Sequence, residues 1–233
     1  MNVIFRADAN AQMGTGHLMR CLALAQAWQD ASGHPIFVMA AEPSTIESRL
    51  KSEEIEIIHL SAQPGSIGDA IQTAHLARER EATWVVVDGY HFDSAYQTGI
   101  KDAGLKFMAI DDCGDAKHYF ADIVLNQNLH ADEALYVNKE PYTRLLLGTR
   151  YVLLRKEFLK WRGWKREIPE VGGNVLVTMG GGDPDNVTLK VIQALNQMDS
   201  PELKVKVVVG PSNRHVKELQ AASRKPQYTF FRM

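Results

Sequence analysis

Short apolar runs alternate along the chain with segments whose apolar residues recur every three or four positions. The short runs predict buried strands, and the wider spacing predicts helices with one buried face. The expected strands cover residues 3–5, 35–39, 55–60, 83–88, 106–110, 121–125, 144–147, 174–179, 205–209 and 228–231. Strands that alternate with helices at this pace indicate an α/β fold built on doubly wound parallel sheets.

Two helices have the clearest apolar faces. Those faces comprise Leu18, Cys21, Leu22, Ala25 and Trp28 in the first helix, and Ile67, Ala70, Ile71, Ala74 and Ala77 in a helix over residues 66–80. A further helix is expected to begin at Ser44, because Ser44 and Glu47 have the spacing of a capping box. Another is expected over residues 94–103.

The chain is expected to form two domains. Residues 161–173 are basic, contain glycine and include Pro169, which is typical of a linker. We therefore expect a Rossmann-like domain over residues 1–160 and a second, partial one over residues 174–233. Its roughly 60 residues are fewer than the ~100 of an ordinary domain. Apolar surface around Val207, Val208 and Phe230 is then expected to lack cover, and the open sheet edge could support self-association.

A glycine loop between the first strand and the first helix has the strongest functional signal. It contains Gly14 and Gly16 and lies at the carboxyl end of a strand and the amino end of a helix, where a phosphate is attracted. His17 falls in the first helical turn, where the helix dipole favours a neutral ring that can accept a proton. Arg20 follows one turn later and could hold an anionic group beside the imidazole. A lone histidine is often only a packing residue, but this loop and Arg20 favour the functional interpretation.

The residues from Phe5 to Arg20 form the motif Phe-Arg-x-Asp-x-x-x-x-Met-Gly-x-Gly-His-x-x-Arg. This motif resembles the opening of the UDP-2,4-diacetamido-2,4,6-trideoxy-β-L-altropyranose hydrolases of pseudaminic acid biosynthesis, and of similar domains in spore coat polysaccharide biosynthesis proteins. The resemblance implies a GT-B-like fold of two Rossmann-like domains and a catalytic role for His17. It implies a UDP-sugar as the substrate, with no metal and no cofactor. Asp8, together with the two glycines and Arg20, is an expected substrate contact.

Asp88 and Tyr90 follow a buried strand in the segment Asp-Gly-Tyr-His. They should lie at the same sheet edge as the His17 loop, because parallel strands end together. The Asp-Gly pair is also typical of a simple turn, and this interpretation is an equal alternative. The functional alternative, that both side chains contact a sugar, agrees with the Asp and Tyr that the resembled family has in this loop, although in another order.

Three carboxylates, Asp111, Asp112 and Asp115, follow the next strand. Such a cluster can bind Mg²⁺. Adjacent residues of an extended chain point in opposite directions, however, so Asp111 and Asp112 should not share an ion. We expect no metal, and expect one of them to cap the turn or to orient the His17 loop.

Two later segments also resemble the family. Residues 148–158 match its Gly-x-x-Tyr-x-x-Leu-Arg-x-Glu-Phe pattern, which makes Tyr151 and Arg155 candidate contacts. A solvated arginine on a packed helix is an equal alternative for Arg155. A second glycine loop contains Gly180, Gly181 and Asp183, with Asp183 as the expected N-cap of a helix. Two glycine loops that faced each other across a cleft would form a nucleotide-sugar site.

Composition excludes several other classes. The 233 residues are 45% hydrophobic with a net charge of −2, so no basic surface is expected to recruit nucleic acid. The two cysteines, Cys21 and Cys113, lack metal-ligand spacing, which favours a reducing cytoplasm. We find no signal peptide and no apolar run near the ~18 residues of a membrane span, so neither secretion nor membrane insertion is expected.

The favoured function is hydrolysis of a UDP-sugar, with His17 as general base, the loop at residues 180–182 holding the departing UDP, and inversion at the anomeric carbon. One alternative is a GT-B-like glycosyltransferase, in which a sugar hydroxyl replaces water. A nucleotide-dependent oxidoreductase is a weaker alternative, because Met19 occupies the third glycine position of the dinucleotide motif. The last alternative is a shortened, non-catalytic protein that binds a nucleotide-sugar.

Overall fold

The computed structural model describes residues 1–9, 14–40, 46–198, 200 and 202–232. The chain divides into two compact units, the first ending at Arg162 and the second beginning at Gly163. The expected start of a helix at Ser44 lies outside the described residues. Within the described part of the chain, no helix has the length and apolarity needed to cross a lipid bilayer.

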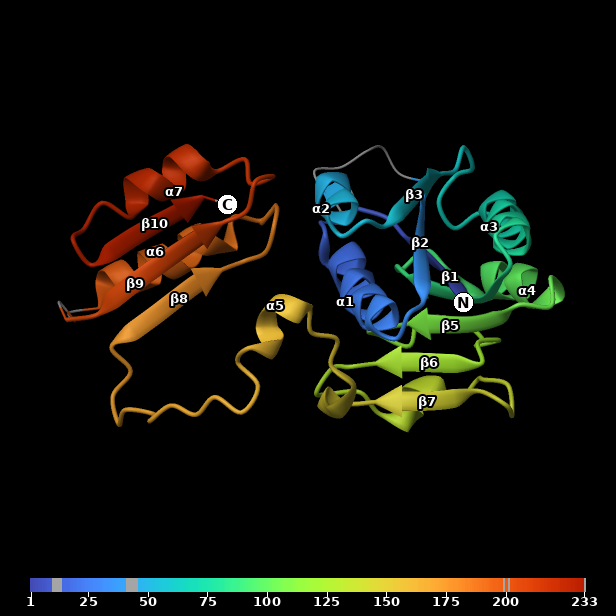
Figure 1. The fold of residues 1–233 in the computed structure, drawn as a ribbon. Helices are drawn as coiled ribbons and strands as arrows, with labels where there is room; N and C mark the ends of the chain where they lie inside the picture. Colours follow the sequence, from blue (N-terminus) through green and yellow to red (C-terminus); the bar gives the residue numbers. More distant parts are fainter. Residues whose placement is uncertain (10–13, 41–45, 199, 201, 233) are drawn as a thin grey trace. The chain divides into compact units, whose positions relative to one another are not determined.

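The first unit is built on a seven-stranded parallel sheet with the order β3-β2-β1-β4-β5-β6-β7 (Figure 1). The strands are β1 (Asn2–Ala7), β2 (His34–Met39), β3 (Glu56–His59), β4 (Ala82–Asp88), β5 (Lys106–Ile110), β6 (Ile123–Asn126) and β7 (Arg144–Leu147). Strand β1 pairs with β2 on one side and with β4 on the other, so the strand order reverses between β1 and β4. Ligands of open α/β sheets bind at such a switch point, beyond the carboxyl ends of the strands.

Helices cover both faces of this sheet. They are α1 (Gly16–Asp30), α2 (Ile46–Ser52), α3 (Ile67–Glu79), α4 (Ser94–Asp102) and α5 (Lys156–Leu159), with short 3-10 turns η1 (Glu133–Tyr136) and η2 (Thr149–Tyr151). Alternate residues of β1 point to opposite faces: Val3 and Phe5 join the core under α1 and α2, and Ile4 joins the core under α3 and α4. The predicted strands of this unit are all present; β5 and β7 have the predicted bounds, and the ends of the others are shifted by at most two residues.

Helix α3 packs differently from the prediction. Ala70, Ala74 and Ala77 are buried as expected, but Ile67 and Ile71 are 51% and 61% exposed. The buried face includes the polar side chains of Asp69 and Thr73 instead. The reason is a charged group under the helix, in the middle of the sheet.

That group is Arg6 of β1, whose side chain has no exposed surface. It donates two hydrogen bonds to Asp69, from Nε at 2.9 Å and from Nη2 at 2.7 Å, and lies 2.8 Å from Asp8. Asp8 also accepts from the backbone N–H of Ala40 at 2.7 Å. Burial alone would raise the pKa of Asp8, but the contacts with His91 and Arg6 hold that pKa well below its ordinary value. The cluster links β1, β2 and α3 through one guanidinium that is shared between two buried carboxylates.

The second unit contains a three-stranded parallel sheet with the order β10-β9-β8. Its elements are β8 (Asn174–Thr178), α6 (Val187–Gln197), β9 (Lys204–Val209), α7 (Val216–Ala222) and β10 (Tyr228–Arg232). The expectation that Val207 lacks cover is wrong: Val207 is fully buried against the core that contains Ile192 and Leu219. Phe230 packs against the same core, and the exposed apolar side chains of this sheet are Leu176 and Phe231 instead. Self-association through the sheet stays a prediction.

We expect Arg6→Met to lower the free energy of unfolding by about 3–5 kcal/mol, because it leaves the carboxylates of Asp8 and Asp69 buried without their cation. Urea unfolding at neutral pH, followed by circular dichroism, measures this change. Arg49→Met is the matched control, since Arg49 pairs with Glu53 at the surface and its loss should change stability by less than about 1 kcal/mol. Equal effects of the two substitutions would contradict the assigned role of Arg6.

Candidate active site

The carboxyl ends of three neighbouring strands meet beside helix α1. In the parallel register, Ala7 at the end of β1 is paired with Asp88 at the end of β4, and Asp88 is paired with Ile110 at the end of β5. The loops that follow these strands therefore leave the sheet side by side. The polar residues after β4 and β5 come close to the first turns of α1.

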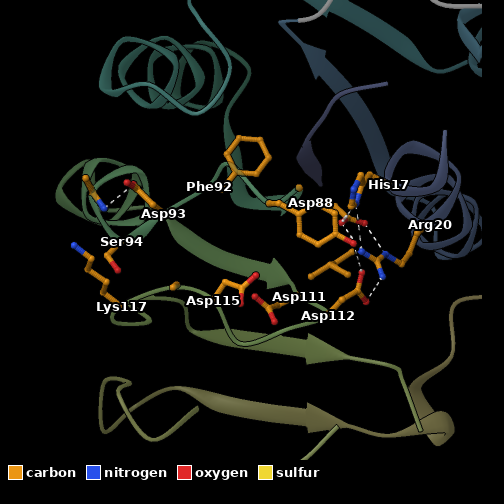
Figure 2. Close-up of a pocket in the computed structure, with 15 residues that line it drawn as sticks. His17, Arg20, Asp88, Phe92, Asp93, Ser94, Asp111, Asp112, Asp115 and Lys117 are labelled. Atoms are coloured by element: carbon orange, nitrogen blue, oxygen red, sulfur yellow. Dashed lines mark hydrogen bonds and ion pairs between the residues drawn. The ribbon is translucent and has the colours of Figure 1, made fainter. Parts of the chain in front are cut away.

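His17 and Asp88 form a buried pair at this edge. The Nδ1 atom of His17 lies 2.7 Å from Oδ1 of Asp88, and the Asp88 carboxylate has no exposed surface (Figure 2). An ionised carboxylate only accepts hydrogen bonds, so the proton of the neutral ring belongs on Nδ1. The other ring nitrogen, Nε2, then has a free lone pair and can accept a proton. Tyr90 sets its ring edge-on against His17, with centroids 4.9 Å apart and an angle of 83°.

Arg20 holds the same carboxylate from the next turn of α1. Its Nε donates to Oδ2 of Asp88 at 2.7 Å and its Nη2 donates to Oδ1 at 2.6 Å, which is a bidentate contact. Its Nη1 donates to Asp112 at 2.6 Å. Each nitrogen of the guanidinium is thus engaged by a carboxylate. This arrangement indicates that Arg20 positions Asp88. It fits less well with a role for Arg20 in binding a phosphate of the substrate.

Asp112 and Asp111 have separate roles. Asp112 accepts from Arg20 and, at 2.7 Å, from the side-chain amide of Asn128. Burial opposes ionisation of Asp112, but the hydrogen bond and charge of Arg20 keep its pKa below the ordinary value. Asp111 caps the following turn by accepting from the N–H groups of Cys113 and Gly114. The sequence-based expectation was that one of the two carboxylates caps the turn or orients the His17 loop; in the structure Asp111 makes the capping contacts.

A cavity of about 370 Å³ opens beside the His17–Asp88 pair (Figure 2). Four residues proposed from the sequence line it together, namely His17, Arg20, Asp88 and Tyr90. Burial raises the pKa of the Tyr90 phenol, and the negative charge of Asp112 raises it further. The phenol therefore stays protonated at neutral pH, and its hydroxyl donates to Oδ2 of Asp112 at 3.5 Å.

Other residues proposed for the first unit lie elsewhere. Asp8 is fully buried and bound to Arg6, which leaves it no surface for a ligand. Gly14 has a φ of 73°, a backbone conformation that favours glycine, and Gly16 is the first residue of α1. Tyr151 packs against the core under α1, with the Arg150 guanidinium over its ring at 5.0 Å. None of these lines the cavity.

Arg155 is engaged at the surface. Its Nε donates to Glu157 at 2.7 Å, and its guanidinium lies 5.0 Å from the centre of the Phe158 ring. It precedes the short helix α5 and does not line the cavity. These contacts favour the alternative of a surface arginine. The segment is not packed as that alternative expected, because Leu154, Phe158 and Trp161 are exposed.

In the second unit, the loop after β8 holds the remaining proposed contacts. Gly180 has a φ of 74°, and the backbone of Gly181 lies so close to Gly210 that a side chain on Gly210 would collide with it. Helix α6 begins at Val187, three residues later than expected, so Pro184 is not its first residue. The Asp183 carboxylate nevertheless accepts from the N–H groups of Val187 and Thr188, at 2.8 and 3.0 Å.

Several lining residues were not proposed as contacts from the sequence. They are Asp93, Ser94, Ala95, Asp115, Ala116 and Lys117. Asn128, the partner of Asp112, was not proposed either. The sequence could have indicated it, because it belongs to a polar stretch that follows β6, the strand beside β5. In the described part of the chain, no cluster of three or more His, Cys, Asp or Glu side chains has a metal-binding arrangement.

The chain matches no protein-family model. A UDP-2,4-diacetamido-2,4,6-trideoxy-β-L-altropyranose hydrolase of Campylobacter jejuni is 30% identical over 224 residues, which are 94% of this chain and 73% of that relative. An uncharacterized protein of Methanocaldococcus jannaschii is 24% identical over 223 residues, which are 94% of this chain and 44% of that protein. The chain therefore spans less than half the length of this second relative.

Solved structures share the fold. HepE of Anabaena in complex with UDP has a TM-score of 0.60 at 15% identity, with coverage of 100% of this chain and 69% of that chain. MurG of Acinetobacter baumannii has a TM-score of 0.55 at 16% identity, with coverage of 100% and 66%. These neighbours have the GT-B-like arrangement of Rossmann-like domains, so the predicted fold class is confirmed.

The pairing of His17 with Asp88 predicts a single ring tautomer. We expect neutral His17 to have its proton on Nδ1, measured from the ¹⁵N shifts of the imidazole in a long-range ¹H–¹⁵N NMR spectrum. Asp88→Ala should release the ring to a mixture of tautomers, because the acceptor that selects Nδ1–H is lost. Asp115→Ala, which removes another carboxylate of the cavity, should leave the tautomer unchanged. An Nε2–H ring in the unmodified protein would contradict this geometry.

Proposed function

Because this chain belongs to the family of the UDP-2,4-diacetamido-2,4,6-trideoxy-β-L-altropyranose hydrolases, we propose that it hydrolyses a UDP-activated amino sugar at the anomeric carbon. The products are UDP and the free sugar, for use in cell-surface polysaccharide or pseudaminic acid biosynthesis. The observation that carries the proposal is the His17 ring, held by Asp88 with its second nitrogen free, at the wall of a cavity.

His17 acts as the general base in this reaction. Nε2 takes a proton from a water molecule while the water oxygen forms a bond to the anomeric carbon. The bond from that carbon to the UDP oxygen breaks, and UDP leaves with the electron pair. Asp88 stabilises the imidazolium that forms, and Arg20 keeps Asp88 in place. Attack opposite to the leaving group inverts the anomeric configuration.

Each glycine loop, taken by itself, is proposed to offer backbone N–H groups to a phosphate of the substrate. Backbone N–H groups at Gly180 and Gly181 can approach a phosphate closely, because no side chain intervenes. The Asp183 carboxylate already accepts the first N–H groups of α6, so we assign Asp183 to shaping this loop. Gly14 and Gly16 play the corresponding part before α1.

The reaction is proposed to need neither a metal nor another cofactor. Asp111 accepts from two backbone N–H groups and from the hydroxyls of Tyr119 and Tyr136. Asp112 is engaged by Arg20 and Asn128. Both carboxylates are therefore bound to donors that a cation would have to displace. Two free cysteines, one of them exposed, support a reducing cytoplasm as the location.

His17→Asn should keep the fold and reduce UDP release by about 10²-fold or more, because the general base is lost. The assay follows UDP formed from a panel of UDP-amino sugars in the presence of EDTA, with the fold checked by circular dichroism. His75→Asn is the matched control, since His75 is an exposed side chain of α3 that lies 3.9 Å from Glu79 and does not line the cavity, so its loss should leave the rate unchanged.

Unchanged turnover by a folded His17→Asn protein would contradict the proposal. Turnover that vanished in EDTA and returned with Mg²⁺ would contradict metal independence. The same assay separates the glycosyltransferase alternative, because UDP release that required an added acceptor sugar would indicate transfer in place of hydrolysis.

A further inference from the structure

Exposed apolar side chains are concentrated in the segment that leaves the seven-stranded sheet after β7 and contains α5 (Figure 1). Five large apolar side chains between residues 152 and 162 are 44–54% exposed, namely Val152, Leu154, Phe158, Leu159 and Trp161. Single exposed apolar side chains are ordinary, but so many within one short segment form a patch that marks an interaction site. We call residues 152–162 the basic apolar segment, because of the charges described below.

Hydrogen bonds hold the backbone of this segment on the first unit. The N–H group of Leu153 donates to the side chain of Gln127 at 2.7 Å, and that of Lys156 donates to the side chain of Gln26 at 2.9 Å. Leu153 packs against the core under α1, and the residues on either side of it are exposed. The apolar side chains are therefore presented outward from an anchored backbone.

The segment is positively charged, although the whole chain is not. It contains four cations and one carboxylate, a net charge of +3, whereas the 233 residues together have a net charge of −2. The charged residues are Arg155, Lys156, Glu157, Lys160 and Arg162. The next nine residues, 163–171, add two cations and two carboxylates, so they leave this balance unchanged.

Neighbouring carboxylates neutralise only part of this charge. Arg155 donates to Glu157 at 2.7 Å, and Lys156 lies 2.9 Å from Asp30. Lys160 and Arg162 contact no carboxylate of the described residues. The charged neighbours of the segment are Asp30, Arg49 and Glu53. With these neighbours included, five cations face three carboxylates, and an excess of two positive charges remains.

Cations and exposed aromatic rings lie together in this segment. The Lys160 ammonium lies 5.6 Å from the centre of the Trp161 ring, and the Arg155 guanidinium lies 5.0 Å from that of Phe158. Aromatic rings with Lys or Arg beside them are typical of peptide segments that lie in the headgroup region of a bilayer.

We propose that the basic apolar segment docks this protein on a membrane surface that contains anionic lipids. Its aliphatic and aromatic side chains enter the boundary between headgroups and acyl chains, and Lys160 and Arg162 contact lipid phosphates. The docking is peripheral, since the single turn of α5 is far too short to span a bilayer. None of these side chains lines the cavity beside His17, so the inference does not depend on the proposed hydrolase activity.

Two other occupants fit the segment less well. A second copy of the chain in a two-fold contact would bring two positively charged segments together, which their excess charge opposes. A nucleic acid would use the cations and the aromatic rings. It would leave Val152, Leu154 and Leu159 without apolar partners, whereas acyl chains can cover all three.

Cosedimentation of the full chain with vesicles tests the proposal. The vesicles are pure phosphatidylcholine, or phosphatidylcholine with about one third phosphatidylglycerol. We expect the partition coefficient to be at least about tenfold higher on the anionic vesicles, because each cation near an anionic surface favours binding. Raising the salt from about 0.1 M to about 1 M should remove most of this preference, because mobile ions screen the attraction.

Two double variants separate the charged from the apolar contribution. Lys160→Gln with Arg162→Gln should reduce the preference for anionic vesicles to about threefold or less, since the uncompensated cations are lost. Leu154→Ser with Leu159→Ser should weaken binding to anionic vesicles by about tenfold, because less apolar surface leaves water.

The matched control is Lys190→Gln with Arg224→Gln, which removes one exposed lysine and one exposed arginine from the second unit. It should change neither the preference nor the strength of binding. Circular dichroism confirms that each variant is folded.

Equal binding to the two kinds of vesicle, or binding to neither, would overturn the proposal. So would vesicle binding that neither double variant of the segment changes. Tighter binding to a single-stranded RNA oligomer than to anionic vesicles, unaffected by the two leucine substitutions, would assign the segment to nucleic acid instead. A dimer that forms without lipid and is lost in the leucine variant would assign it to a second copy of the chain.

Discussion

The carboxylate of Asp88 is the charge around which the site is built. It has no exposed surface, and an uncompensated charge in such a place costs several kcal/mol. Its partners, two N–H groups of Arg20 and one of His17, both come from the first turns of α1. The contacts that compensate the buried charge therefore also fix the orientation of the imidazole. A ring held in this way can act as a base without reorganisation when the substrate arrives.

The hydrophobic cores set the distances on which this pair depends. Apolar residues on both faces of the seven-stranded sheet hold β1, β4 and β5 in parallel register, with Asp88 directly beside the end of β5. Arg20 can therefore reach Asp88 and Asp112 at once, and Asn128 of the next loop can support Asp112. A change in register would separate these groups. Packing of the two cores therefore sets the geometry of the candidate site.

Sequence patterns predicted the part of this arrangement that depends on local order. Apolar periodicity located the strands, and the rule that parallel strands end at one edge brought the loops of His17 and Asp88 together. The pairing of charged residues that lie far apart in the sequence could not be predicted in this way. Asp8 was expected to meet substrate but is paired with Arg6, which also binds Asp69, 63 positions away. Periodicity carries no information on which buried charges will pair.

The same limit explains the other differences. Ile67 and Ile71 fit an apolar helix face, yet α3 turns Asp69 toward Arg6 and leaves both isoleucines exposed. Arg20 was expected to contact an anion, and its donors are occupied by Asp88 and Asp112. In each case a tertiary ion pair determined the orientation, because compensation of a buried charge outweighs the exposure of one or two apolar side chains.

The destination of the water oxygen tests the central claim most directly. If His17 directs water to the anomeric carbon, hydrolysis in H₂¹⁸O places the label in the free sugar and none in UDP. Mass spectrometry of the two products measures this, and ¹H NMR during the first turnovers should show the anomer of inverted configuration. Label in the phosphate of UDP would mean attack at phosphorus and would contradict the role assigned to the His17–Asp88 pair.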